Sequence, residues 1–304
     1  MQKLRAGPSG WRVDAALVLV ALIWGATFVL VKQALNDIST MLFLTLRFTF
    51  AAVGLTLLFQ GKARSEVRQG GNLGTSLKGG LLAGVCLFAG YVLQTFGLKY
   101  TTAAKAGFIT GLYIPLVPLF AALLYAKLPK AAEAAGVACA FVGMALITVQ
   151  GDLRSINGGD LLVTACAVAY ALHILVLGRF AQKASVAVLT IVQIATAALL
   201  GALTFWWVET PRLRPSADVW LALGVTSLLA TALAFFIQTW AQQYSSPTRT
   251  ALIFSMEPVF AWVTSYLVAG EVLNGRAIAG AALILGGILL VELKPSGFGQ
   301  HPSS

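Results

Sequence analysis

Three titratable side chains stand well inside long apolar runs of the sequence, at Arg47, His173 and Glu257. A charge at the centre of a lipid bilayer costs about 2.5–3.5 kcal/mol on insertion scales, so such residues usually face a cavity or a partner. Glu257 is a candidate for proton coupling or cation recognition, and His173 is predicted at a similar depth, where it could tune that carboxylate. The alternative is a structural glutamate, hydrogen-bonded to neighbouring helices. For Arg47 a structural role is preferred, because a long arginine can snorkel or hold a helix end.

Aromatic and hydroxyl-bearing side chains accompany these three residues in the apolar runs. Apolar groups with a polar edge suit a substrate that is itself part apolar and part polar. Packing or contact with lipid is an equal alternative for any single one of them. With Arg47, His173 and Glu257, the candidates for substrate binding or coupling are Trp24, Thr27, Phe28, Tyr113 and Tyr170.

Motifs for other kinds of chemistry are missing from the sequence. There is no GxxxxGK[ST] phosphate loop, no HExxH and no GxSxG, and the chain has only two histidines. Cys86, Cys139 and Cys166 fall inside apolar runs without a CxxC pair, which is typical of buried small side chains. ATP-driven transport by this chain alone, a multi-histidine metal site and a bound cofactor are therefore not expected, and no catalytic residue is assigned.

The segments that must position the candidate residues belong to an internal repeat that occurs twice in the chain. YVLQTFGLKY at 91–100 returns as FFIQTWAQQY at 235–244, an offset of 144, which also relates Gly136 to Gly280 and Gly143 to Gly287. Such self-similarity outranks local signals in assigning a fold. Each copy holds five apolar runs, an odd number, so the second copy enters a membrane from the opposite side. Inverted repeats of this kind place a transporter's substrate site between the halves, near the bilayer midplane.

Two glutamines, Gln94 and Gln238, occupy the same position of the repeat. They lie close to the ends of the third and eighth apolar runs. We expect them to act in gating or in helix-end hydrogen bonds rather than in recognition at mid-depth. Nearer the start of each copy the offset is 146, which pairs Trp24 with Tyr170.

Prolines interrupt two apolar runs that are mates in the repeat. Pro115 and Pro118 lie in the fourth run, and Pro258 follows Glu257 in the ninth. A proline removes a backbone donor and frees a carbonyl one turn back. Interrupted helices at matching positions of two halves point to a transporter's binding site. Proline kinks with only a packing role are the alternative.

The composition places these runs in a membrane. Of the 304 residues, 58% are hydrophobic and 11% are charged, whereas a soluble domain has about 25% charged residues. A spanning helix needs roughly 20 mainly apolar residues. The sequence predicts an all-α protein with ten spans, at 13–31, 40–59, 77–98, 106–125, 131–149, 161–177, 187–208, 219–240, 251–269 and 277–293.

The lysines and arginines predict the orientation of the chain. With the N-terminus inside, 13 of the 21 fall in cytoplasmic segments, which favours both termini inside, although Arg212 and Arg214 in an outer loop go against it. The first run is of full span length without a cleavage site, so it is expected to remain as a helix. The formal net charge of +10 is attributed to topology and lipid headgroups, and nucleic acid is not an expected partner.

Four stretches of the sequence resemble the drug/metabolite transporter superfamily, specifically its EamA-type ten-helix members. They are WGATFVLVK from Trp24, LRFTFAA from Leu46, MEPVFAWVTSYLVAGEVL from Met256 and AGAALILGGILLV from Ala279. The resemblance covers roughly residues 13–293. It implies two inverted five-helix repeats, 13–150 and 159–293, around a central cavity lined mainly by spans one, three, four, six, eight and nine.

The resemblance also implies a function and a residue set. It implies export or exchange of small metabolites, often amino acids or related compounds, in the bacterial inner membrane. Glu257 and Pro258 look like the family's Glu-Pro pair, Glu271 like its glutamate at the end of span nine, and Arg47 like its span-two arginine. The first copy departs from the pattern, with Ile114 and Lys127 where acidic groups would be expected, so the two halves are not expected to play equal roles.

The favoured interpretation is a secondary transporter, a monomer or a homodimer, that works by alternating access on a small molecule and can be coupled to protons. An intramembrane enzyme acting on a lipid or prenyl substrate is the alternative, and it would require polar groups clustered near one interface. A channel would require a continuous polar stripe along a helix. The isolated, deep polar residues fit neither requirement.

Overall fold

In the computed structural model the chain is described over residues 8–70, 72–101, 103–126, 128–148, 157–269 and 275–293, and every regular element within these ranges is a helix. The elements are α1 (Gly10–Ala34), α2 (Thr40–Arg68), α3 (Leu73–Gly97), α4 (Ala103–Thr110), α5 (Tyr113–Tyr125), α6 (Ala131–Thr148), α7 (Gly158–Phe180), α8 (Val186–Val208), α9 (Ala217–Ser227), the π-helix η1 (Leu228–Leu233), α10 (Ala234–Ala241), α11 (Pro247–Phe254), α12 (Glu257–Ala269) and α13 (Gly275–Leu293). The prediction of an all-helical protein is confirmed.

Length and apolar character make many of these helices suitable for a membrane. Six are long and apolar enough to cross one: α1, α2, α3, α7, α8 and the continuous helix of α9, η1 and α10. Three shorter apolar helices lie within α5, α6 and α13. Large apolar side chains such as Leu57, Leu58 and Leu123 are exposed on the outside of the bundle, where lipid would cover them.

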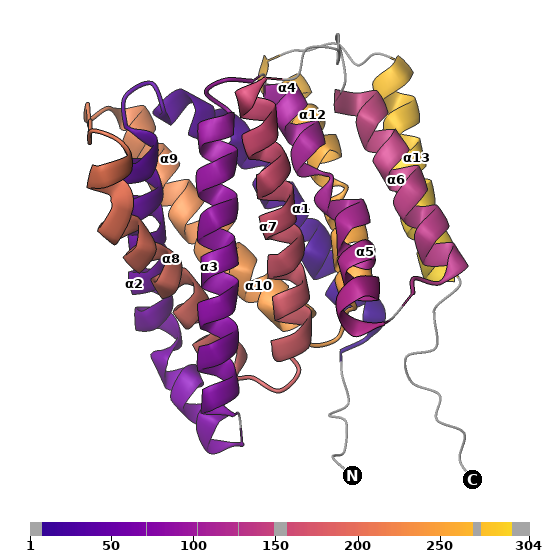
Figure 1. The fold of residues 1–304 in the computed structure, drawn as a ribbon, viewed down its shortest axis with the longest axis horizontal. Coiled ribbons are helices and arrows are strands. Elements are labelled where there is room, and N and C mark those ends of the chain that lie inside the picture. The colour runs from indigo at the N-terminus through magenta and orange to yellow at the C-terminus, as the bar shows by residue number, and fades with distance from the viewer. Residues whose placement is uncertain are drawn as a thin grey trace.

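The bundle has two ends, seen in Figure 1. Helix α1 begins and α13 ends at one of them, here called the termini side. Helix α1 ends and α2 begins at the other, here called the loop side. On the loop side the Ser39 N–H donates to Arg212 O (2.9 Å) and the Arg214 N–H to Asp37 O (2.7 Å), so the α1–α2 and α8–α9 connections pair with each other. The Arg212 side chain also donates, from Nη2 to Asn36 O (3.1 Å), so this arginine, which goes against the charge rule, has a structural role here.

Two of the predicted spans, the two that prolines interrupt in the sequence, are each divided into two helices. The run at 106–125 is α4 and α5 with a turn at Gly111, and the run at 251–269 is α11 and α12 with a turn at Ser255. The prolines explain both breaks. Pro115 cannot donate to the carbonyl of residue 111, nor Pro258 to that of Phe254, so the α-helical ladder lacks a bond there. The two turns lie 144 residues apart, at equivalent positions of the repeat.

Helices α6 and α13 lie side by side at one edge of the bundle and cross at repeat-related glycines (Figure 1). A Cβ atom on Gly143 would lie 2.5 Å from Gly280 O, and one on Gly287 would lie 2.6 Å from Gly136 O. The contact is thus reciprocal, with each helix offering a carbonyl to the other's glycine. Small residues are what permit such close approach of helices in a membrane.

We expect Gly287→Val to lower the free energy of unfolding in detergent by about 1–3 kcal/mol, the usual cost of overpacking a tight contact. Its neighbour provides a matched control, because no atom lies within 4 Å of a Cβ built on Gly286. Thermal unfolding of Gly287→Val and Gly286→Val checks this. Equal losses in the two variants would contradict the assignment of the close contact to Gly287.

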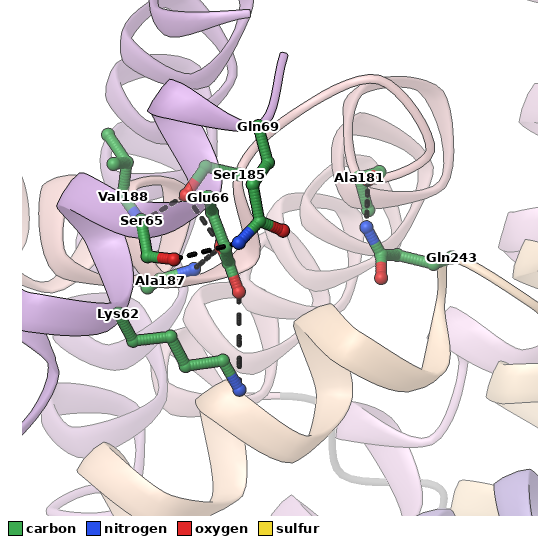
Figure 2. Close-up of polar contacts among 9 residues, drawn as sticks. All are labelled: Lys62, Ser65, Glu66, Gln69, Ala181, Ser185, Ala187, Val188 and Gln243. Atoms are coloured by element: carbon green, nitrogen blue, oxygen red, sulfur yellow. Dashed lines mark hydrogen bonds and ion pairs between the residues drawn. The ribbon is translucent and has the colours of Figure 1, made fainter. Parts of the chain in front are cut away.

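The helix ends on the termini side are joined by hydrogen bonds (Figure 2). Glu66 Oε2, at the end of α2, accepts from Ser185 Oγ (2.7 Å) and from the Ala187 N–H (3.1 Å) at the start of α8. Gln243 Nε2, just after α10, donates to Ala181 O at the end of α7 (2.8 Å). Carboxylates are favourable at helix N-termini because the first N–H groups have no partner within the helix. These contacts join helix ends in two pairs, α2 with α8 and α7 with α10.

Candidate functional site

A cavity of about 100 Å³ lies within the bundle, between segments from both copies of the repeat. Its lining comes from α1, α2, α3, α4, α5, α7, α10, α11 and α12. A water molecule needs roughly 10–15 Å³ on this measure, so the cavity has room for several waters or for part of a small ligand. Val31, Leu44 and Leu98 place it toward the loop side, and Trp24, Tyr170 and Glu257 extend it to the middle of the bundle.

The candidate residues from the sequence converge on this cavity. All of them whose side chains are described line it: Trp24, Thr27, Arg47, Gln94, Tyr113, Tyr170, His173, Gln238 and Glu257. The side chain of Phe28, on α1, and the whole of Glu271 and Lys127 lie outside the described residues. Helices α6 and α13, expected at the periphery, contribute nothing described to the lining, whereas α2 contributes Leu44 and Arg47.

Arg47 is held in the cavity wall by neutral groups. Its Nε donates to Thr231 Oγ1 (2.7 Å), and its Nη2 donates to the Tyr91 hydroxyl (3.1 Å) and to Ala230 O (3.4 Å). The guanidinium carbon also lies 4.7 Å from the centre of the Tyr91 ring. Among the described residues no carboxylate forms an ion pair with Arg47, although its side chain is only 5% exposed. Within the described part of the chain, the wall therefore contains a positioned cation without an anionic partner.

The π-turn η1 supplies one of these acceptors. The Ala234 N–H donates to the carbonyls of Leu229 and Thr231 and not to that of Ala230, its partner in an α-helix. Ala230 O is thus free to accept from Trp24 Nε1 (2.9 Å) and from Arg47. Single π-turns within α-helices are frequently found at functional sites. This one ties α1 and α2 to the centre of the helix that carries Phe235 and Gln238.

Glu257 begins α12 directly after the turn at Ser255. No hydrogen bond or ion pair to its carboxylate is found within the described residues, so the structural alternative of a glutamate bonded to neighbouring helices has no support there. Gly25 on α1 allows the close approach, since a Cβ there would lie 2.6 Å from the Glu257 carbonyl oxygen. As far as the described residues go, the cavity also contains an acidic side chain without a cationic partner.

His173 belongs to a separate chain of hydrogen bonds. Its Nε2 lies 2.9 Å from Gln193 Oε1, and Gln193 Nε2 donates to Thr239 Oγ1 (3.1 Å). Gln193 stands where the other copy of the repeat has Arg47, at an offset of 146. No hydrogen bond or ion pair between His173 and Glu257 is found in the described part of the chain. The suggestion that His173 tunes Glu257 stays a prediction without such a bond behind it.

Aromatic rings form the apolar part of the wall, and sequence reasoning missed several of them. Trp24 lies between Phe235 (centroids 5.4 Å apart) and Phe254 (5.0 Å). Tyr91 packs edge-on against Tyr170 at 5.7 Å. Tyr91 and Phe235 were visible as the first residues of the repeated decapeptide, three positions before Gln94 and Gln238. Their helical spacing was therefore a usable signal that they share a face with those glutamines.

Comparison with known proteins bears directly on this arrangement. The model of the EamA-like transporter family matches residues 11–149 and again 157–293. The chain belongs to the EamA-like transporter family. An uncharacterized transporter of Archaeoglobus fulgidus is 34% identical over 92% of this chain and 86% of its own length. The protein is thus a multi-pass membrane transporter rather than an enzyme, and its partners are a small-molecule substrate and the lipid bilayer.

Other relatives of this EamA-like transporter extend the comparison. A protein of Streptantibioticus cattleyicolor named a probable terminal-alkyne amino-acid exporter is 26% identical over 95% of this chain and 96% of its own. A solved crystal structure, 21% identical, superposes with a TM-score of 0.78 over 93% of this chain and 97% of the other. That likeness shows the fold alone.

Proposed function

We propose that this EamA-like transporter is a secondary transporter that exports or exchanges small zwitterions of the amino-acid class by alternating access. One observation carries the proposal: Arg47 and Glu257 line the same mainly apolar cavity, and neither has an ion-pair partner among the described residues. Leaving a buried charge without a partner is costly. A substrate with a carboxylate and an ammonium supplies the missing partner to both. The name of the Streptantibioticus cattleyicolor relative supports the same class.

The aromatic wall agrees with a substrate of this kind. The rings of Trp24, Phe235 and Phe254 suit an apolar side chain, or an ammonium group that lies over a ring face. In the absence of substrate, Glu257 is the group that would take up a proton. Substrate and proton would then compete for one carboxylate, which is the simplest route to coupled exchange.

We further propose how the chain is organised in the membrane. Residues 13–150 and 159–293 would form two inverted five-helix repeats with ten crossings. The termini side would face the cytoplasm of a bacterial cell, across the inner membrane. The matching of one family model to each half and the equivalent breaks at Gly111 and Ser255 support this organisation.

Counterflow into proteoliposomes tests the proposed function. Vesicles loaded with an unlabelled mixture of L-amino acids are diluted into traces of labelled amino acids, amines or organic acids, with and without a pH gradient. We expect labelled amino acids to accumulate against their gradient, and simple amines and acids much less. Counterflow of amines or acids alone, or of none of the three classes in sealed vesicles, would contradict the proposal.

An ion pair joins two helices near the termini side of the bundle. The Arg249 Nη2 and Nε atoms lie 2.6 and 2.9 Å from the Asp14 carboxylate, so a two-point contact joins α11 to α1. Alternating access requires the cavity to open to each side of the membrane in turn. We therefore expect this pair to be a closing contact of the state described here.

Neutralising the pair should favour opening toward the termini side. We expect Asp14→Asn to raise the labelling rate of a cysteine placed at Ile174, which lines the cavity, by about fivefold from that side, the effect of about 1 kcal/mol. The measurement uses a membrane-impermeant thiol reagent in a background without Cys86, Cys139 and Cys166. The exchanged pair, Asp14→Arg with Arg249→Asp, should restore slow labelling. If the exchanged pair were labelled as fast as Asp14→Asn, the ion-pair explanation would be refuted.

A further inference from the structure

The two repeat-related glutamines of the cavity wall, Gln94 and Gln238, differ in their hydrogen bonds. Gln94 is engaged at both ends of its amide. Its Oε1 accepts from the Tyr170 hydroxyl (3.1 Å), and its Nε2 donates to Thr110 Oγ1 (3.2 Å). Because neither end is left over, Gln94 is a structural part of the wall that ties α3 to α7 and α4.

Gln238 stands at the end of a short relay whose polarity is fixed. The backbone carbonyl of Ile174 can only accept, so Gln242 must present its Nε2 there, at 2.9 Å. The Gln242 Oε1 is then left to accept from Gln238 Nε2, at 3.2 Å. Turning either amide over would bring two oxygens face to face. The Gln238 amide is therefore oriented by the backbone, through Gln242.

One atom is left over by this relay. Among the described residues Gln238 Oε1 has no hydrogen-bond partner, and the residue is 1% exposed. A buried acceptor without a partner is destabilising. Gln238 lines the cavity together with Phe254 and Glu257, so a molecule bound there would lie next to its side chain.

We propose that Gln238 is a specificity-determining residue whose Oε1 accepts a hydrogen bond from an N–H of the substrate ammonium, while Glu257 balances its charge. This inference rests on the proposed function above. Because Gln238 would bind the N–H and Glu257 the charge, the site would distinguish ammonium groups by the number of N–H bonds they carry. A quaternary ammonium has the positive charge that Glu257 balances, but it has no N–H to donate to Gln238.

The test compares three forms of one substrate in counterflow. The probes are the L-amino acid that gives the highest rate, its N-monomethyl derivative and its N,N,N-trimethyl derivative. We expect the wild-type protein to prefer the parent over the trimethyl form, and Gln238→Met to reduce this preference by about tenfold or more, the worth of a hydrogen bond to a charged group. The loss should fall on transport of the parent, and the monomethyl form should lie between the two.

The matched control is Gln94→Met, which makes the same change at the other copy of the repeat. It should slow transport of the parent and the trimethyl form equally, because both ends of the Gln94 amide are already engaged within the protein. Steric effects of the methyl groups cancel when the two variants are compared. If Gln238→Met does not fold, Gln238→Asn moves the acceptor back by one methylene and should lower the preference in the same direction. An unchanged preference in the Gln238 variants, or an equal loss in Gln94→Met, would overturn the inference. Absence of amino-acid counterflow in the wild type would instead overturn the proposed function, and this inference with it.

Discussion

Replacing Glu257 with glutamine is expected to abolish transport driven by a pH gradient, with a fall of about 30-fold or more, because losing one partner of a buried charge pair costs about 2 kcal/mol or more. The glutamine is nearly the same size and keeps a hydrogen-bonding group, so the close approach of Gly25 to α12 should be preserved. Glutamine can neither release a proton nor balance an ammonium. The measurement is the initial rate of amino-acid accumulation in proteoliposomes with an imposed pH gradient.

The control for this variant is another carboxylate at the start of a helix. Asp218 lies in the first turn of α9, exposed and away from the cavity lining, and Asp218→Asn should transport normally. Thermal unfolding in detergent should show the Glu257 variant to be as stable as the wild type or more so, since it removes a carboxylate without a partner from the wall. Normal gradient-driven transport by Glu257→Gln would remove Glu257 from the coupling mechanism and leave it a structural role.

Replacing Arg47 with glutamine is expected to remove the selectivity for a carboxylate-bearing substrate. The wild-type protein should transport an amino acid faster than the amine obtained by decarboxylation. In Arg47→Gln this ratio should fall by about 30-fold or more, for the same reason of an abandoned partner charge. The loss should come from the amino acid, because the amine has no group that Arg47 could bind. Competition between the labelled pair in counterflow measures the ratio directly.

Arg47 also has a structural role, and the experiment must separate this role from substrate selectivity. Its bonds to Thr231, Tyr91 and Ala230 hold α2 to α3 and η1, so Arg47→Gln should also lower thermal stability. Arg64→Gln, on the same helix but exposed near its termini-side end, should change neither selectivity nor stability. A stability loss in Arg47→Gln with an unchanged substrate ratio would show that the arginine only holds the helices together.

Much of this fold follows from features that are local in the sequence. Apolar runs of span length predict the helices, and the repeat of 91–100 at 235–244 predicts that two sets of helices share one plan. The breaks at Gly111 and Ser255 were less clear, because a proline can either kink a helix or end it, and packing decides between these. The π-turn at 228–233 left no signal, since its segment LLATAL reads as ordinary apolar helix.

The candidate site was predicted to a similar extent. Deep polar residues such as Arg47 and Glu257 are conspicuous in a lipid-like sequence, and they do lie on one cavity. What the sequence could not predict is which groups bond to one another. Depth alone suggested that His173 could meet Glu257, but depth leaves the rotation of each helix open, and it gave no sign of the hydrogen bond between His173 and Gln193. The difference between Gln94 and Gln238 likewise depends on Tyr170, Thr110 and Gln242, which arrive from other turns and helices.

The π-turn also bears on how the chain length of this helix can change. An α-helix pairs each N–H with the carbonyl four residues back and a π-turn with the one five back, so η1 carries one extra residue for the same path. Deleting one residue from 228–233 would leave the side chains of α9 and α10 in their present orientation relative to each other. Deleting one elsewhere in Ala217–Ala241 would rotate all later side chains by about 100° around the helix axis. The shortened helix would keep Phe235 and Gln238 on the cavity wall. In the shortened helix, however, the Ala230 carbonyl would accept a backbone N–H of its own helix and would no longer be free for Trp24 and Arg47. The one extra residue in η1 is therefore what makes this carbonyl available to the site.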